Sequence, residues 1–267
     1  LYFGALLVLD EDMNWEKFIG RTFRFTVYSL LAGGLAAAVL LPEIYVLQTT
    51  ASGDVNFPKT FSEYFPIFDM LARHIGNVET EIGLDHWPNL YCGVAVLMFF
   101  VLYLACRQIR AKEKVVTCTL LLFFLASFSI NVLNFIWHGF HYPNSLPCRQ
   151  SYIYIFLVLS ACYRAYTHLD QIPWKQITGA FAGAVVFVLL AQKLTTESHF
   201  HFIVFYVAIL FLALYLGVIY LYKKGIRYQN LVALLALTVV SIESAVNMTV
   251  TSVTTTSRTA YKADNQA

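Results

Sequence analysis

Long apolar runs, separated by short polar connectors, dominate this sequence. The runs cover residues 25–48, 90–106, 115–134, 151–166, 177–192, 202–222 and 231–250. A helix rises about 1.5 Å per residue, so about 20 residues cross a hydrocarbon core of about 30 Å. Lipid offers no hydrogen-bond partner to backbone N–H and C=O groups, so each run is expected to be helical. The sequence therefore predicts an all-α, polytopic transmembrane helix bundle with seven full spans.

Composition excludes several other classes of protein. Charged residues make up 13% of the chain, against about 25% in soluble domains. The net charge of +2 gives no sign of nucleic-acid binding. No P-loop, dinucleotide fingerprint, zinc-protease motif or Ser/His/Asp elbow is present, so soluble-enzyme chemistry is unsupported. The five cysteines show no CxxC spacing and are expected to be small buried hydrophobes.

The two ends differ from the rest of the chain. Residues 1–9 are apolar but too short to span a membrane, and they lack a basic segment before them. We expect them to be the remainder of a cut transmembrane helix and not a signal peptide. The expected organisation is a helical bundle over 1–250, the C-terminal part of a larger membrane domain. Residues 251–267 are expected to begin an outer, truncated tail or soluble domain.

The distribution of Lys and Arg predicts an orientation. Of the 18 such residues, twelve lie in one set of connectors and six in the other. Cytoplasmic connectors are enriched in these residues, so the first set is assigned to the cytoplasm. Loops 49–89 and 135–150 and the C-terminal tail are then extracytoplasmic. Within loop 49–89, apolar residues at helical spacing between 61 and 72 predict an amphipathic helix, either in the membrane interface or packed on the bundle.

One polar stretch, residues 134–152, separates two apolar runs. Arg149 begins the second run after Pro147. An arginine at a helix N-terminus suits a phosphate, because its guanidinium donates two hydrogen bonds and the free amides add positive potential. We interpret the stretch as a candidate site for a lipid phosphate or its sugar. Its candidate binding residues are Asn134, Trp137, His138, His141, Asn144 and Arg149.

Two other interpretations of this stretch stay open. Trp137, His138 and Tyr142 could form an interfacial aromatic belt, with Arg149 paired to a headgroup. A metal could be bound by His138 and His141, but only Cys148 could join them as a further ligand. We therefore predict no metal and no other cofactor.

Acidic residues inside apolar runs form a second candidate constellation. Glu243 and Asn247 lie one helical turn apart in the last run, and Glu43 follows Pro42 in the first. An acid within a membrane costs about 2.5 to 3.5 kcal/mol on insertion scales, so it usually faces a helix interface or a wet cavity. Ser241 and Ser244 could instead satisfy Glu243 as structural polar contacts. Glu43, Glu243 and Asn247 are the candidate cavity residues.

Several blocks resemble one family. The most specific is the stretch from Asn134 to Arg149, with its Trp-His-Gly-Phe-His core. Others are 29–35, Leu-Leu-Pro at 40–42, Pro-Asn-Leu-Tyr-Cys-Gly at 88–93 and Glu-Ser-Ala-Val-Asn at 243–247. In content and order, these blocks resemble the bacterial YfhO-type membrane proteins.

The resemblance implies a multi-pass protein of the bacterial cell membrane with a GT-C-like fold. Such a protein would transfer a sugar from a polyprenyl-phosphate donor to a cell-surface polymer acceptor such as lipoteichoic acid. Arg149 and His138 would then hold the phosphate, and His141, Asn134 and Asn144 would contact sugar or phosphate. In that class the catalytic acid lies in the first outer loop, which we expect upstream of Leu1.

Two other functional classes are consistent with the sequence. A transporter or flippase of lipid-linked sugars is favoured if Glu243 lies at the membrane midplane beside broken helices. A non-catalytic scaffold for envelope assembly is the third class. The sequence specifies neither the sugar nor the acceptor.

Overall fold

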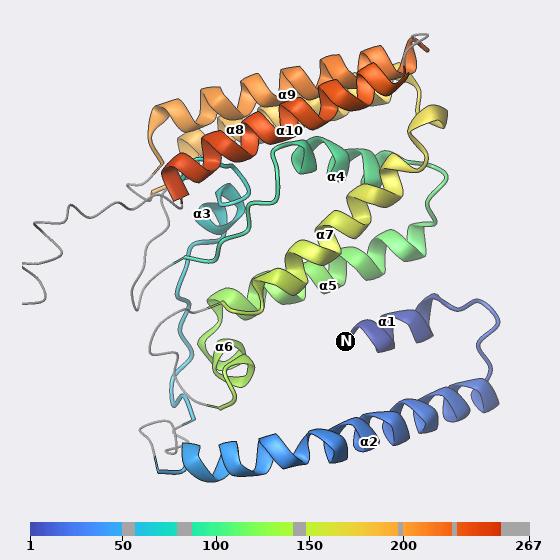
Figure 1. The fold of residues 1–267 in the computed structure, drawn as a ribbon, viewed down its shortest axis with the longest axis vertical. Coiled ribbons are helices and arrows are strands. Elements are labelled where there is room, and N and C mark those ends of the chain that lie inside the picture. Colours follow the sequence, from blue (N-terminus) through green and yellow to red (C-terminus); the bar gives the residue numbers. More distant parts are fainter. Residues whose placement is uncertain (50–56, 79–86, 141–147, 197–199, 226–228, 252–267) are drawn as a thin grey trace, which may run out of the picture. The chain divides into compact units, whose positions relative to one another are not determined.

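A computed structural model describes the chain outside residues 50–56, 79–86, 141–147, 197–199, 226–228 and 252–267. Its regular elements are all helical and follow one another along the chain as labelled in Figure 1. No sheet occurs in the described ranges. The helices are α1 (Tyr2–Leu9), α2 (Trp15–Leu47), α3 (Ile67–Ala72), α4 (Ala95–Ala105), α5 (Ala111–Ser129), α6 (Asn131–Trp137), α7 (Ser151–Tyr166), η2 (Leu169–Gln171), α8 (Trp174–Leu194), α9 (Phe202–Lys223) and α10 (Gln229–Thr251).

Four helices are long and apolar enough to cross a membrane. They are α2, α8, α9 and α10. The prediction of an all-helical membrane protein is thereby confirmed in its coarse form. The run 90–106 forms only the 11 residues of α4, because the chain from 87 to 93 is not helical and Gly93 has a φ of 102°. Seven full spans and a GT-C arrangement stay predictions.

The chain divides into two compact units, which are described separately. The first unit contains Leu1–Tyr64 and Arg110–Asn144. The second contains Phe65–Ile109 and Ser145–Ala267. The division means that residues 134–144 and Arg149 belong to different units.

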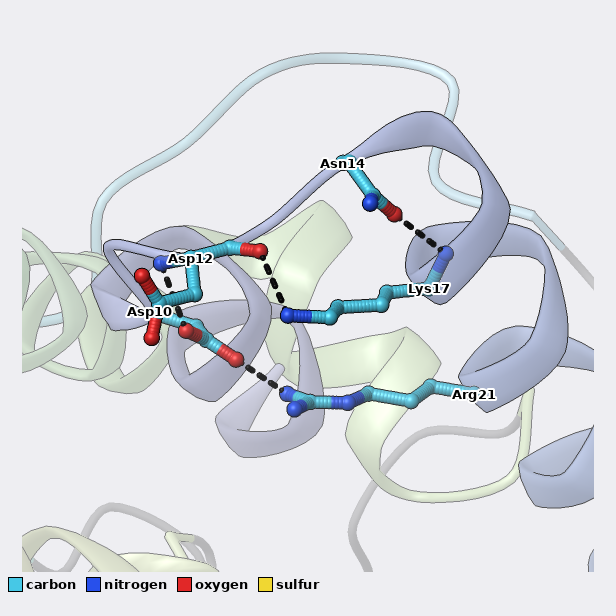
Figure 2. Close-up of polar contacts among 5 residues, drawn as sticks. All are labelled: Asp10, Asp12, Asn14, Lys17 and Arg21. Carbon is cyan, nitrogen blue, oxygen red and sulfur yellow. Dashed lines mark hydrogen bonds and ion pairs between the residues drawn. The ribbon is translucent and has the colours of Figure 1, made fainter.

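In the first unit, a charged turn joins α1 to α2 (Figure 2). Asn14 caps α2 by accepting a hydrogen bond from the Lys17 amide at 2.8 Å. Asp10 forms an ion pair with Arg21 at 2.6 Å. The Asp12 amide, followed by the Arg21 guanidinium, holds the pKa of Asp10 below its ordinary value. These contacts explain why α2 begins at Trp15, ten residues before the predicted apolar run.

Also in the first unit, the run 115–134 is broken at Ile130. Ile130 has extended backbone angles and pairs with Glu63 in an isolated antiparallel bridge. The Asn131 side chain accepts from the Ser62 amide at 3.2 Å and donates to the Thr60 carbonyl at 2.7 Å. The Asn131 backbone amide donates to the Ser62 carbonyl at 3.1 Å and the Tyr64 amide donates to the Ser129 carbonyl at 2.9 Å, in place of helical hydrogen bonds at the break. The single predicted span therefore becomes α5 followed by the short α6.

In the second unit, α4 packs against α7, α8 and α9, and α9 also packs against α8 and α10. Small residues allow the helix backbones to approach closely, as is common between membrane helices. Five alanines are among the buried residues of this core: Ala161 and Ala165 of α7, Ala180 and Ala184 of α8, and Ala208 of α9. The core thus holds α4, α7, α8 and α9 together beside the site described below.

The amphipathic helix expected between 61 and 74 is shorter in the structure. It corresponds to α3, which packs against α8. Its Asp69 is 1% exposed and accepts two hydrogen bonds from Thr196, from the amide at 2.9 Å and the hydroxyl at 2.7 Å. Phe68 is exposed instead. The polar side of α3 therefore faces the protein, and its location in a membrane interface stays a prediction.

Candidate functional site

A buried carboxylate on α10 holds the start of α4. Glu243 is 2% exposed. Its Oε1 accepts from the Val94 amide at 2.6 Å and from the Tyr91 hydroxyl at 2.7 Å, and its Oε2 accepts from the Tyr215 hydroxyl. Val94 is the N-cap of α4, and the first amides of a helix have no partner within the helix. A carboxylate there satisfies one such amide and also interacts favourably with the helix dipole.

This carboxylate lines a cavity of about 510 Å³ among α4, α7, α9 and α10. Aromatic side chains supply much of the wall. Glu243 is the only charged side chain among the described residues that line it. The cavity thus combines one negative charge with an otherwise apolar and phenolic surface. Its aromatic lining residues are Tyr91, Phe99, Tyr163, Tyr166 and Tyr215.

Asn247, one turn after Glu243, anchors the segment that follows α3. Its Oδ1 accepts from the Asn77 amide at 2.8 Å. Asn77 has a φ of 63°, in the left-handed region that asparagine tolerates better than most residues. A Cβ on Gly76 would lie 2.6 Å from Cε2 of Tyr91 and 3.2 Å from Oδ1 of Asn247. Glycine is therefore required for this close approach.

A second, small cavity of about 20 Å³ adjoins the same residues. Arg73, Trp87, Asn89, Tyr91 and Asn247 are among its lining residues. The Arg73 guanidinium lies 5.8 Å from the centre of the Trp87 ring and 5.5 Å from that of Phe200. Both distances suit a cation–π contact. Tyr91 lines both cavities, one with the negative Glu243 and the other with the positive Arg73.

A third cavity, of about 240 Å³, lies among α4, α7 and α8 and is mostly apolar. His74 and Tyr154 are the polar residues that line it. The His74 Nδ1 lies 2.8 Å from the Leu71 carbonyl, which can only accept, so Nδ1 carries the proton. Nε2 then accepts from the Tyr154 hydroxyl at 2.9 Å. Burial lowers the pKa of His74 and keeps the ring neutral.

Two of the predicted site residues lie together. Glu243 and Asn247 both line this region, the first in the large cavity and the second in the small one. Glu43 lies exposed on α2 in the other unit. Within the second unit, the structure thus joins the α10 pair to Tyr91, Val94 and Asn77.

The predicted phosphate-binding stretch is described in part. Asn134 and His138 are buried on and just after α6, and the His138 Nδ1 donates to the Asn134 carbonyl at 2.8 Å. The buried His138 Nε2 has no hydrogen-bond partner among the described residues. Trp137 is half-buried against Phe124, with ring centres 5.5 Å apart. His141 and Asn144 lie outside the described residues.

Arg149 is exposed in the turn before α7 and belongs to the second unit. Its role beside His138 stays a prediction. No cluster of three or more His, Cys, Asp or Glu residues suited to a metal ion occurs in the part of the chain that is described.

Sequence reasoning missed the partners of Glu243 and the buried polar residues near α3. Tyr91 lay in a motif that carried the family resemblance, but no role was assigned to it. Asp69 and Arg73 stand four residues apart, which places them on one helix face. A buried acid needs donors, and tyrosines in apolar runs are the obvious source. That requirement was the available signal for Tyr91 and Tyr215.

Comparison with known proteins identifies the family of this chain. A family model described as bacterial membrane protein YfhO matches residues 1–267. No curated protein and no solved structure matches the chain.

Proposed function

Because this chain belongs to the YfhO family of bacterial membrane proteins, we propose that it serves glycosyl transfer at the outer membrane face. The donor is a polyprenyl-phosphate-linked sugar, and the acceptor is a cell-surface polymer such as lipoteichoic acid. The membrane part has a GT-C-like arrangement with seven full spans. Loops 49–89 and 135–150 and the C-terminal tail face outward.

The observation that carries this proposal is the cavity beside Glu243. A cavity of about 510 Å³ with a buried carboxylate and several phenols is unusual among apolar helices. Ligand sites are typically apolar cavities with a few well-placed polar groups. An isoprenoid-linked sugar has both parts, an apolar chain for the helices and hydroxyl groups for a carboxylate.

The chemistry of the transfer requires further groups. An acceptor hydroxyl must lose a proton to a base, and cations or amide donors must stabilise the departing phosphate. Arg149 supplies a cation in this proposal. The buried Nε2 of His138 supports a role for this residue in binding, because a ligand hydroxyl would satisfy it.

The experiment compares bacterial cells that lack the protein with cells that carry it as wild type, Arg149→Ala or His138→Ala. We expect the sugar content of the surface polymer to fall without the protein and in both variants. Arg164→Ala is the control, because it removes an arginine from the last turn of α7, the helix that follows Arg149 in the chain. Unchanged sugar content in cells without the protein would refute the proposed function. Unchanged content in both variants would remove only those residues from it.

A second function, translocation of the lipid-linked sugar, is favoured by one observation. The α4 helix has only 11 residues, and an intramembrane acid holds its N-terminus. Short helices whose termini meet polar groups are typical of transporter binding sites. Accumulation of the lipid-linked sugar on the cytoplasmic leaflet in cells without the protein would favour translocation. Accumulation on the outer leaflet would favour transfer.

A further inference from the structure

The single charged side chain in the described lining of the Glu243 cavity is negative. Its described lining contains one carboxylate and no Lys, Arg or His. A phosphate placed there would be repelled by the Glu243 carboxylate, and the described lining offers no cation to offset the repulsion. The positive side chain of Arg73 lines the small cavity instead, which shares Tyr91 with the large one. A lipid phosphate therefore does not belong beside Glu243.

The three hydrogen bonds of Glu243 leave one of its acceptor positions unused. An ionised carboxylate only accepts hydrogen bonds and has about four acceptor positions. Three are used by Val94, Tyr91 and Tyr215. The remaining position on Oε2 suits a donor from a ligand in the cavity. The phenols already donate to Glu243, so their oxygens are free to accept from further hydroxyl groups.

The wall of the cavity adds a second preference. Tyr163 of α7 and Val240 of α10 both line it and are 64% and 46% exposed. They therefore border its opening. Aromatic rings offer flat apolar faces, which complement the C–H face of a pyranose ring. The cavity therefore suits a ligand that has hydroxyl donors on its edge and an apolar face, and a sugar has both.

We propose that the Glu243 cavity binds the hydroxyl groups of the sugar and excludes the phosphate that links it to the lipid. The inference rests on the proposed function for the identity of the ligand. It goes beyond it by assigning the glycosyl subsite to α4, α7, α9 and α10. Glu243 accepts from a sugar hydroxyl, and Tyr91 and Tyr215 position the carboxylate.

The test uses three photo-crosslinking probes with the same octyl chain and different heads. The heads are a glucoside, a phosphate and a primary ammonium group. The intact protein is reconstituted in lipid nanodiscs, and labelled peptides are identified by mass spectrometry. We expect the glucoside to label the segments around Tyr163 and Val240 about tenfold more than the phosphate, a ratio that one charge-assisted hydrogen bond supplies.

Two variants make the test specific. Val240→Phe narrows the opening without touching the hydrogen bonds of Glu243 and should abolish the preference for the glucoside. Ile242→Phe is the matched control, because Ile242 is 52% exposed on the same helix and does not line the cavity. Glu243→Gln keeps an acceptor oxygen but removes the charge. It should lower labelling by the glucoside and raise labelling by the phosphate, which a purely structural role would not do.

Three results would overturn the inference. Equal labelling by phosphate and glucoside would show that the cavity does not exclude anions. Stronger labelling by the ammonium probe than by the glucoside would show that the cavity prefers cations to sugar hydroxyls. Undiminished glucoside labelling in Val240→Phe would place the sugar elsewhere. None of these readouts requires glycosyl transfer, so the inference can fail while the proposed function stands, and the reverse also holds.

Discussion

Glu243 on α10 accepts a hydrogen bond at 2.6 Å from the amide of Val94, the N-cap residue of α4. This bond joins two helices that are far apart in the sequence and fixes the start of α4 against α10. The carboxylate therefore has a structural role in addition to the one proposed for it in ligand binding. The two roles lead to different mutational effects.

Replacing Glu243 by alanine should be much more damaging than replacing it by glutamine. Alanine leaves the buried Val94 amide, the buried Tyr215 hydroxyl and the half-buried Tyr91 hydroxyl without this acceptor, and each buried group costs about 1 to 3 kcal/mol. Glutamine keeps an oxygen for Val94 and Tyr91. We expect Glu243→Ala to lower the free energy of unfolding by about 3 to 5 kcal/mol and Glu243→Gln by about 1 kcal/mol. Thermal unfolding in detergent measures both, and an alanine variant as stable as wild type would contradict the contact.

Gly76→Ala should destabilise the packing around Tyr91, the residue that donates a hydrogen bond to Glu243. The new methyl group would lie 2.6 Å from the Tyr91 ring, so the ring that donates to Glu243 must move. Overpacking of this kind typically costs about 1 to 3 kcal/mol. Gly179→Ala on α8 is the control, because its Cβ meets nothing within 4 Å, and it should be neutral or slightly stabilising. Equal melting temperatures for the two variants would argue against the close approach.

The Asp69 and Thr196 side chains should be energetically coupled. Their hydrogen bonds tie α3 to the end of α8. A double-mutant cycle with Asp69→Asn and Thr196→Val should give a coupling energy of about 1 to 2 kcal/mol. The cycle is read from chemical or thermal unfolding of the four proteins. Additive effects of the two substitutions would mean that the contact does not stabilise the fold.

Acidification should destabilise the segment that contains His74. Burial lowers the pKa of its folded form below the ordinary value of 6.5, so the unfolded chain binds the proton more readily. Stability from this group is therefore complete above about pH 6.5 and falls as the pH decreases towards the folded-state pKa. His74→Gln should flatten the dependence of melting temperature on pH between about 5 and 7. An unchanged slope in the variant would exclude His74 as the cause.

The sequence predicted the helical membrane class because lipid leaves so few backbone choices, and α8, α9 and α10 follow the predicted runs closely. It did not predict the break at Ile130, because that break depends on Asn131 bonding to Ser62 and Thr60 far along the chain. Within the candidate site, Glu243 and Asn247 were identified by their polarity alone. Tyr91 and Tyr215 were not, because a tyrosine in an apolar run looks like a membrane-interface residue until its partner is known.

The most direct test of whether the Glu243 cavity binds the lipid-linked sugar is the sugar content of the surface polymer. It is compared between cells that carry Val240→Phe and cells that carry Ile242→Phe, at equal amounts of the protein in the membrane. We expect a loss of about tenfold or more for Val240→Phe, because the ring obstructs the cavity beside Glu243. Ile242→Phe should leave the content at the wild-type level. Wild-type content in both variants would contradict a role for this cavity in sugar transfer.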